Sequence, residues 1–400
     1  MLSVIKPSIW FIILIVGFPQ LSETIFAPLL PSIVEKFQTT QTLSQMSLSV
    51  FFFGFGFGVF IWGSLSDRIG RKKALLFGVL CYALGSFLLF TASNIYIFLA
   101  YRVLQAFGAA SGSIVAQTIL RECFHDPKER VATFSTVSAA LAWTPALGPL
   151  LGGQLVAFLG MGSVFIFLTV LGLTIFFCTQ LTLKEVQKES IQNVKFGIVL
   201  QRMIKDPQIY LNTLLVAGLN SVIFSIYSES PFVFMNTFEW SPRSYSFTGV
   251  GMALFSVLGS RINKALAYGG VKAAGRIKIG LLSMIFSGFL YALPTLLGFE
   301  SHTYFKMGWM LLSLCLIFMG IVVSLPNILG EALNSYKDCL GTAGALFGLG
   351  YYLVISFLLA FISSFSSENL LFIGALVGGL SFAMLLLSCF LVYHEASKAG

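Results

Sequence analysis

Charged side chains are scarce in this 400-residue chain. Asp, Glu, Lys and Arg together make up 10% of the residues, whereas a soluble domain carries about 25%. Apolar residues make up 57%. A soluble core could not hide this much apolar surface, so lipid must solvate a large part of it. The composition therefore excludes an ordinary soluble globular protein.

The net charge of +8 does not indicate a nucleic-acid partner. The basic residues lie in short segments between apolar runs, and not along one face or in a tail. Attraction to anionic lipid head groups and retention on the cytoplasmic side explain this placement better. The expected surroundings are a lipid bilayer, with no nucleic acid bound.

Residue patterns for metal, disulfide and nucleotide chemistry are also missing. The six cysteines are scattered without a C-x-x-C pair, and the three histidines have no ligand-like spacing. No G-x-x-x-x-G-K-[ST] phosphate loop and no H-E-x-x-H occurs. No cofactor or metal is expected, and the sequence argues against ATP hydrolysis. If the protein moves a compound uphill, an ion gradient must supply the energy.

What the chain has instead is a series of long apolar runs. A helix needs about 20 apolar residues to cross the hydrocarbon of a bilayer. The first run is too long for a signal peptide and is not followed by a small-x-small cleavage site, so it is predicted to be a retained span. The runs predict an all-α polytopic membrane protein with twelve transmembrane helices, at 8–30, 43–65, 74–93, 95–119, 131–158, 162–183, 208–231, 244–267, 273–298, 304–330, 339–365 and 368–393.

Basic residues divide the loops into two sets. Of the 24 Lys and Arg residues, 20 fall in the termini and in alternate loops on one side. Lys36, Arg243 and Lys306 fall on the other side, and Arg102 lies within a span. Loops rich in Lys and Arg stay in the cytoplasm. Both termini are therefore predicted to be cytoplasmic, in an integral protein of the inner, cytoplasmic membrane of the cell.

The longest polar stretch divides the chain nearly in half. Residues 259–264 repeat the glycine and serine of residues 63–68 and replace the Asp and Arg by Asn and Lys. Both segments fall between the second and third spans of their half, and two six-helix halves are the plan of large transporter folds. We predict two pseudo-symmetric halves, at 1–183 and 208–400, joined by a cytoplasmic linker at 184–207.

The segment between the second and third spans, residues 63–73, reads G-S-L-S-D-R-I-G-R-K-K. Its glycines let the two helices turn closely, and its single Asp lies among basic side chains. Such a cluster can hold the cytoplasmic face closed by charge pairs that break when the face opens. A basic loop that only fixes topology is the alternative, but it does not explain the glycine and Asp spacing. The candidate gate residues are Gly63, Asp67, Arg68, Gly70, Arg71 and Lys72.

Two ionisable residues lie well inside predicted spans. An arginine within hydrocarbon costs roughly 2.5–3.5 kcal/mol on insertion scales, so Arg102 should face a polar interior and have a function. Glu23 is the only carboxylate well inside the first span. Burial favours its protonated form and a nearby Arg102 favours its ionised form, which suits a group that binds and releases a proton. The alternatives are a snorkelling or structural Arg102 and a static ion bridge. Glu229, near the outer end of the seventh span, is a second candidate for proton coupling.

The fifth span contains a run of glycine and proline, T-P-A-L-G-P-L-L-G-G at residues 144–153. These residues weaken helix hydrogen bonding and permit bending where the halves meet. Tight helix packing alone is the alternative. The candidate residues are Pro145, Gly148, Pro149, Gly152 and Gly153.

Together these segments resemble the major facilitator superfamily of secondary transporters, and in particular its Bcr/CflA (bicyclomycin-resistance type) drug:proton antiporters. Residues 63–73 resemble the superfamily's best-known loop signature. Residues 101–108 resemble its R-x-x-Q-G/A element, in which the arginine is implicated in proton coupling, and residues 144–153 resemble an element associated with antiporters. Two departures leave substrate and coupling open: Thr24 stands where the subfamily usually has an Asp, and Glu229 stands where a small residue is usual.

The resemblance implies alternating access, with a small molecule and protons as partners and a monomer as the expected state. The first hypothesis is proton-driven export of drugs or metabolites from a central cavity lined by Tyr, Phe, Trp, Met and Asn side chains. The second is import of a nutrient, metabolite or siderophore with protons by the same fold. A membrane enzyme or a non-transporting receptor is the third, and the dispersed His, Asp and Glu residues argue against it.

Overall fold

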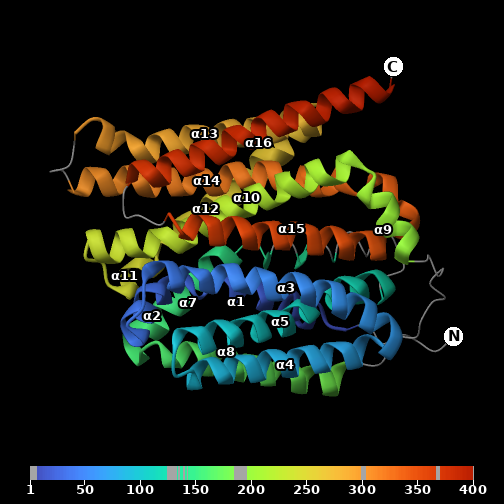
Figure 1. The fold of residues 1–400 in the computed structure, drawn as a ribbon, viewed down its shortest axis with the longest axis horizontal. Coiled ribbons are helices and arrows are strands. Elements are labelled where there is room, and N and C mark those ends of the chain that lie inside the picture. The colour runs from blue at the N-terminus through green and yellow to red at the C-terminus, as the bar shows by residue number, and fades with distance from the viewer. Residues whose placement is uncertain are drawn as a thin grey trace.

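The computed structural model describes residues 7–123, 133, 136–137, 140–141, 143–183, 196–298, 303–365 and 370–399. The helices form two groups that lie side by side (Figure 1). The first group, blue to green in Figure 1, contains α1 (Ile9–Thr24), η1 (Ala27–Leu29), α2 (Leu30–Phe37), α3 (Gln41–Ile69), α4 (Arg71–Thr91), α5 (Ile95–Cys123), α7 (Thr144–Leu159) and α8 (Gly162–Thr182).

A short helix, α9 (Phe196–Ile204), precedes the second group. That group, yellow-green to red in Figure 1, contains α10 (Pro207–Phe232), the π-helical turn η2 (Val233–Thr237), α11 (Pro242–Ser246), α12 (Thr248–Tyr268), α13 (Ala273–Leu296), α14 (Thr303–Ala332), η3 (Asn334–Cys339), α15 (Leu340–Ser363) and α16 (Leu370–Ala399).

Ten helical segments of the described residues are long and apolar enough to cross a membrane. The two remaining predicted spans also coincide with helices. α7 lies in the span predicted at 131–158, most of whose first part falls outside the described residues. α12 lies in the span predicted at 244–267, and its Arg261 and Lys264 explain its weaker apolar character.

Polar residues begin spans at points where the apolar pattern is interrupted. The Thr40 hydroxyl accepts a hydrogen bond from the Leu43 amide at 3.3 Å and begins α3. The Asp206 carboxylate accepts one from the Gln208 amide at 3.0 Å and begins α10. Because the first amides of a helix have no partner within it, such side chains fix where the helix starts.

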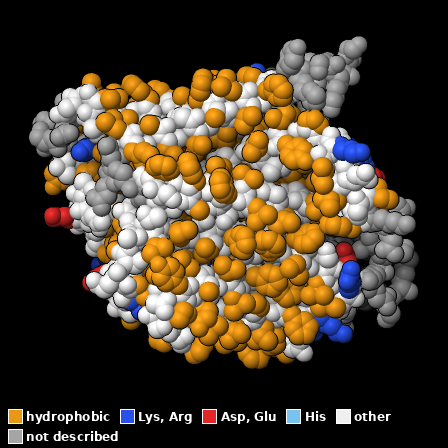
Figure 2. All heavy atoms as spheres, in the orientation of Figure 1, with side chains coloured by type: hydrophobic (Ala, Val, Ile, Leu, Met, Phe, Trp, Pro, Cys, Tyr) orange, Lys and Arg blue, Asp and Glu red, His pale blue; other side chains and the backbone are white. Residues whose placement is uncertain are grey.

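The outer surface is apolar around the middle of the bundle. Phe77, Phe177 and Phe286 are each more than half exposed, at 59%, 59% and 56%. Figure 2 shows hydrophobic side chains across the middle of one face, with charged side chains gathered toward its two ends. Removing apolar surface from water is favourable by about 25 cal/mol per Å². This apolar belt is therefore expected to lie in the hydrocarbon of a bilayer.

The two ends of the bundle are distinguished by the segments they carry. α1 begins, α16 ends and α9 lies at one end, on the right of Figure 1. The junction between α3 and α4 lies there too, because the Phe60 ring in the second half of α3 packs on the Phe196 ring of α9. The two ring centroids are 5.7 Å apart. We call this the basic end and the opposite end, where α2 and α11 lie, the far end. The two groups meet along α3 and α15, and α7 packs on α11 and α12.

Candidate functional site

A cavity of about 1490 Å³ lies between the two helix groups. Its inner part is lined by residues of both groups, among them Glu23 of α1 and Asn220 of α10. At the basic end its lining includes the exposed Arg68 and the exposed Asp338, so the cavity reaches solvent there. Tyr, Phe and Asn line it as expected, but Trp and Met, which were also expected, are not among its described lining residues.

Glu23 lines this cavity from the last turn of α1. At 1.5 Å per residue, its position is about 21 Å along the helix from Ile9. Its side chain is half-buried. Among the described residues, no hydrogen bond or ion pair engages its carboxylate. An acceptor with two oxygens therefore faces the interior of the cavity, available to a proton or to a bound compound.

Arg102 of α5 is fully buried and lies outside the cavity lining. Its guanidinium carbon lies 3.4 Å from the ring centroid of Phe26 and 4.2 Å from that of Phe51. Nη2 donates to the carbonyl of Ser22 at 3.0 Å, and Nη1 donates to Oε1 of Gln105. Stacking between two rings gives this cation a favourable place in an apolar interior.

The predicted pair of Glu23 and Arg102 is close but does not form an ion bridge among the described residues. The two side chains interact electrostatically. Arg102 reaches the backbone of the residue next to Glu23 and not the Glu23 carboxylate. The static bridge that the sequence left open is therefore not the arrangement found here.

A shell of polar side chains fixes Arg102. The Gln105 amide donates to the Ser86 hydroxyl at 2.8 Å, and Ser86 donates to the Tyr82 carbonyl at 2.8 Å. The Tyr82 and Ser22 hydroxyls share a hydrogen bond of 2.6 Å. Sequence reasoning missed Ser22, Tyr82 and Ser86, although isolated polar residues in apolar spans were a usable signal.

Polar contacts join the two groups at the far end. The Gln41 amide donates to Oε2 of Glu229 at 3.3 Å. The Gln45 amide donates to the Ser228 carbonyl at 3.2 Å. We call this set, with the hydrogen bond of 2.7 Å from the Ser49 hydroxyl to the Ser356 carbonyl, the far seam.

Glu229 is thus placed apart from Glu23 and Arg102. It is fully buried in the far seam and does not belong to the cavity lining. Sequence reasoning missed its partners, although Gln41 and Gln45 are spaced four residues apart and so lie on one face of α3. A carboxylate in a seam between two groups would become accessible if that seam opened.

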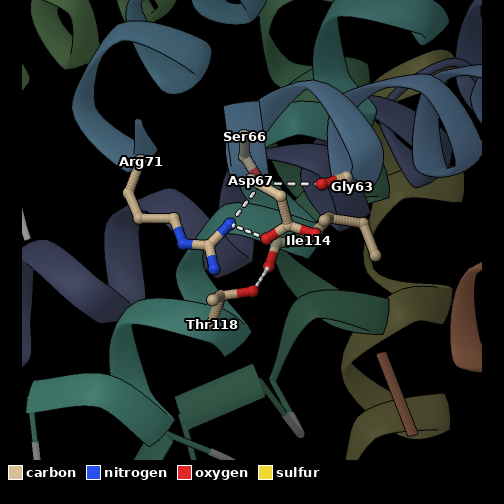
Figure 3. Close-up of polar contacts among 6 residues, drawn as sticks. All are labelled: Gly63, Ser66, Asp67, Arg71, Ile114 and Thr118. Carbon is tan, nitrogen blue, oxygen red and sulfur yellow. Dashed lines mark hydrogen bonds and ion pairs between the residues drawn. The ribbon is translucent and has the colours of Figure 1, made fainter. Parts of the chain in front are cut away.

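The basic segment at 63–73 forms its main charge pair within one helix group (Figure 3). Arg71, only 5% exposed, donates to Asp67 Oδ1 at 2.5 Å and to the Ser66 hydroxyl at 2.8 Å. The Lys72 ammonium donates to the Gln180 carbonyl of α8 at 2.7 Å. Arg68 is exposed and lines the mouth of the cavity. With the cavity open at this end, these contacts tie α3, α4 and α8 together.

The two glycines of this segment differ in what they provide. Gly70 lies between α3 and α4 at φ +99° and ψ 157°, a conformation that is essentially restricted to glycine. An added Cβ at Gly63 would make only ordinary contacts, at 3.7 Å to Ile114 and 3.8 Å to Ala345. Gly70 is therefore the residue that the sharp turn requires.

The corresponding segment of the second group, residues 259–264, lies in α12. Oδ1 of Asn263 accepts hydrogen bonds from Arg276 at 3.3 Å and from Asn327 at 3.0 Å. Asn263 thus accepts from an arginine of the next span, as Asp67 does, but without a charge of its own.

The glycines of α7 face both helix groups. An added Cβ at Gly148 would lie 1.8 Å from the Thr24 hydroxyl, and one at Gly152 would lie 2.4 Å from the Ile25 carbonyl. Gly153 instead faces α11 of the other group, where a Cβ would lie 2.4 Å from the Pro242 carbonyl oxygen. Two further members of the set are prolines: Pro145 in the first turn of α7 and the buried Pro149 within it.

A continuous row of aromatic rings lines the inner cavity across the two groups. The Phe52 ring lies 4.4 Å from Phe224 and 6.0 Å from Tyr352, and Tyr352 lies 4.3 Å from Tyr351. We call this set the aromatic wall; its members are Phe52 and Phe55 of α3, Phe224 and Tyr227 of α10, and Tyr351 and Tyr352 of α15. Sequence reasoning did not identify its members, because aromatic residues are frequent throughout the spans.

Among the described residues, no three or more His, Cys, Asp or Glu residues are placed to hold a metal ion.

A protein family, several relatives and a solved structure are similar to this chain. Residues 12–358 match the family described as Major Facilitator Superfamily. An uncharacterized transporter of Rickettsia bellii is 26% identical over 368 residues, 90% of each chain. Multidrug resistance protein MdtL of Shewanella oneidensis is 29% identical over 232 residues, 58% of each chain. The crystal structure of a D-xylose-proton symporter superposes with a TM-score of 0.75 at 13% identity, covering 94% of this chain and 96% of that one. These findings confirm the predicted twelve-helix fold of two six-helix halves.

Proposed function

Because the chain belongs to the Major Facilitator Superfamily and is therefore a membrane-embedded secondary transporter of small molecules, we propose that it is a proton-coupled exporter of drugs or metabolites. The observation that carries this proposal is the Glu23 carboxylate, which faces the cavity without a hydrogen-bond or ion-pair partner among the described residues. Family membership makes the protein a transporter that works by alternating access, and not an enzyme.

The charge of the basic end supports one orientation of the protein in the membrane. Loops rich in Lys and Arg face the cytoplasm, which places this end and both termini inside the cell and the protein in the inner membrane. The cavity is then open to the cytoplasm and closed outside by the far seam. The name of the Shewanella relative, a multidrug resistance protein, supports export.

In the proposed cycle Glu23 carries the proton. A compound enters from the cytoplasm while the Glu23 carboxylate is ionised, the far seam opens, and a proton from outside replaces the compound. Arg102 stays between the Phe26 and Phe51 rings and bonds to the Ser22 carbonyl, so it does not block the Glu23 carboxylate. Glu229, buried where the outer face must open, is a second proton site.

The moving bodies are the two halves, which we place at 1–183 and 208–400 with the linker 184–207 between them. Polar contacts of the far seam and the α7–α11 contact would have to break when the outer face opens. The contacts of Asp67 and Arg71 would then hold the cytoplasmic end of the first half as one unit while the gate closes. Rigid-body rocking of two halves about a fixed site is the usual course of alternating access.

Inside-out membrane vesicles test this proposal. Respiration acidifies their interior, so an exporter should release protons and accumulate the compound when a transported compound is added. Glu23→Gln should abolish both signals. Asp338→Asn is the matched control, because it neutralises a carboxylate that is 61% exposed at the cavity mouth.

Gradient-driven accumulation that survives Glu23→Gln would reject the role given to Glu23. Proton release accompanied by loss of a labelled metabolite from the vesicle interior, and not by accumulation of the compound, would show an importer instead.

A further inference from the structure

We infer that the turn between α12 and α13 binds the head group of an anionic phospholipid in the leaflet at the basic end. The basic residues around this turn lie outside the cavity lining. The inference therefore goes beyond the proposed function and does not depend on which compound is transported. It is drawn from positive charge that has no acidic partner and from the apolar surface beside it.

Five basic residues gather around this turn. α12 ends and α13 begins there, so both helices run from the turn toward the far end. At 1.5 Å per residue, each basic residue lies within about 11 Å of the turn along its helix axis, and all five lie at a similar depth in the membrane. We call this set the α12–α13 patch; its members are Arg261, Lys264, Lys272, Arg276 and Lys278.

The patch has no acidic partner of its own. Residues 240–299 contain no Asp and no Glu. Among the described residues, no ion pair includes a member of the patch. α14 packs on both α12 and α13 and carries one acidic residue, the half-buried Glu331. Four positive charges remain in excess even when Glu331 is counted against the patch.

The corresponding turn of the first half contains an acid. There Arg71 donates to the carboxylate of Asp67. In the second half Arg276 donates to the neutral Asn263 at 3.3 Å, and its buried Nε has no hydrogen-bond partner among the described residues. A guanidinium binds most strongly to a carboxylate or a phosphate. A phosphate at this turn would supply the negative charge that Asp67 supplies in the first half.

Apolar surface begins one helical turn from the patch. Leu258 lies on the same face of α12 as Arg261, and Leu282 lies on the same face of α13 as Lys278. These two leucines are about half exposed, at 46% and 54%. Tyr268, at the end of α12, is also exposed, and tyrosine is typical of the head-group level of a bilayer. A lipid with its phosphate at the patch can therefore lay its acyl chains along α12 and α13, whereas a soluble polyanion would leave this surface unused.

Charge then decides which phospholipid binds. The phosphate of phosphatidylcholine is balanced by a choline cation, which the patch repels. The phosphate of phosphatidylglycerol keeps its negative charge. Basic side chains near an anionic membrane surface each contribute about fivefold in affinity, so several of them together give a marked preference for the anionic lipid.

Native mass spectrometry of the purified, full-length protein tests the inference. The probes are phosphatidylglycerol and phosphatidylcholine with the same acyl chains, each titrated into the protein in detergent. Phosphatidylglycerol should bind at least about tenfold more tightly than phosphatidylcholine. Glycerol 3-phosphate is a third probe, because it carries the phosphate without the acyl chains, and it should not displace the bound lipid.

Two variants act on the patch itself. The first removes three of its exposed charges and should lower the affinity for phosphatidylglycerol at least about tenfold, with little effect on phosphatidylcholine; it is Arg261→Gln/Lys264→Gln/Lys272→Gln. The second, Asn263→Asp, gives Arg276 an acid of its own and should lower the affinity for phosphatidylglycerol roughly fivefold. It removes no basic residue, so it tests the inference even if the triple variant does not fold.

The matched control removes three exposed charges from the same end of the molecule but outside the patch. It should keep the preference for phosphatidylglycerol, and it is Lys73→Gln/Lys205→Gln/Lys337→Gln. Cooperative thermal unfolding in detergent shows which variants are folded.

Equal affinity for the two lipids would overturn the inference. So would equal losses in the folded patch and control variants, because the lipid would then respond only to the total charge of the basic end. Binding of glycerol 3-phosphate as tight as that of the lipid would show a site for a soluble phosphate and would overturn the assignment to lipid. Transport in vesicles is a separate measurement, so each of these results would leave the proposed function standing.

Discussion

Gly153 and Gly152 are neighbours in α7, yet they pack against different halves of the molecule. A Cβ at Gly153 would lie 2.4 Å from the Pro242 carbonyl oxygen and 2.5 Å from Ser246 Cβ, both in α11. A Cβ at Gly152 would meet the Ile25 carbonyl and Pro28, within its own half. Gly153→Ala should therefore disfavour only the state in which α7 and α11 are in contact, whereas Gly152→Ala should strain both states.

The size of the effect follows from these distances. Ordinary contact to a Cβ begins near 3.4 Å, so the Pro242 carbonyl must retreat by about 1 Å. Because the obstacle is backbone, no side-chain rotation relieves it. Overpacking of this kind costs about 1–3 kcal/mol. At 1.36 kcal/mol for each factor of ten, the population ratio should move toward the outward-open state about 5- to 160-fold.

Spin labels report this shift directly. In a protein whose native cysteines have been replaced, one pair of labels at Lys36 and Arg243 spans the far end, and a second pair at Arg68 and Asp338 spans the basic end. All four positions are exposed. Gly153→Ala should lengthen the distances across the far end and shorten those across the basic end. Pulsed electron–electron double resonance measures both distances.

The controls decide the interpretation. Gly152→Ala should lower thermal stability without moving either distance distribution. Gly379→Ala, where an added methyl meets no atom within 4 Å, should change neither stability nor distances by much. Equal shifts for Gly152→Ala and Gly153→Ala, or none for Gly153→Ala, would refute the view that α7 and α11 separate in the transport cycle.

Three further substitutions test other contacts. Gly70→Ala should lower the thermal unfolding midpoint, because φ +99° with ψ 157° costs a non-glycine residue about 1–3 kcal/mol. Gly197→Ala is its control, because an added Cβ there meets no atom within 4 Å. Equal midpoints for the two variants would contradict the argument. Ser49→Ala removes the hydrogen bond of 2.7 Å to the Ser356 carbonyl in the far seam. It should shift the free-energy difference between the two states toward the outward-open state by about 0.5–1.5 kcal/mol, read from the same label distances. Ser381→Ala removes a hydrogen bond inside α16 and should leave the distances unchanged. Asn263→Asp gives Arg276 and Asn327 a charged acceptor and should raise thermal stability by up to about 1 kcal/mol, whereas a lower midpoint would show that the site rejects charge.

Hydropathy and charge along the chain were enough to predict the spans. The apolar runs mark each helix because every span must bury its own backbone hydrogen bonds in lipid, whatever its neighbours are. The same local logic identified Glu23 and Arg102, since an ionisable residue in an apolar run is conspicuous in one dimension. It also marked the basic segment at 63–73 and the glycines of α7.

Tertiary structure decided what these residues contact. Arg102 was expected beside Glu23, but its partners are the Ser22 carbonyl, Gln105 and two phenylalanine rings. The far seam joins Gln41 to Glu229, 188 residues later in the chain. Nothing in the sequence near either residue indicates such a pairing.

The sequence by itself determined the membrane environment, the number of spans and the candidate charges, because each depends on the transfer of short segments from water to lipid. Only the tertiary structure decided that Glu23 faces a cavity, that Arg102 does not, and that aromatic rings of both helix groups line the same cavity. Those outcomes depend on how two helix groups rotate and pack against each other, and that packing is a property of surfaces assembled from distant parts of the chain.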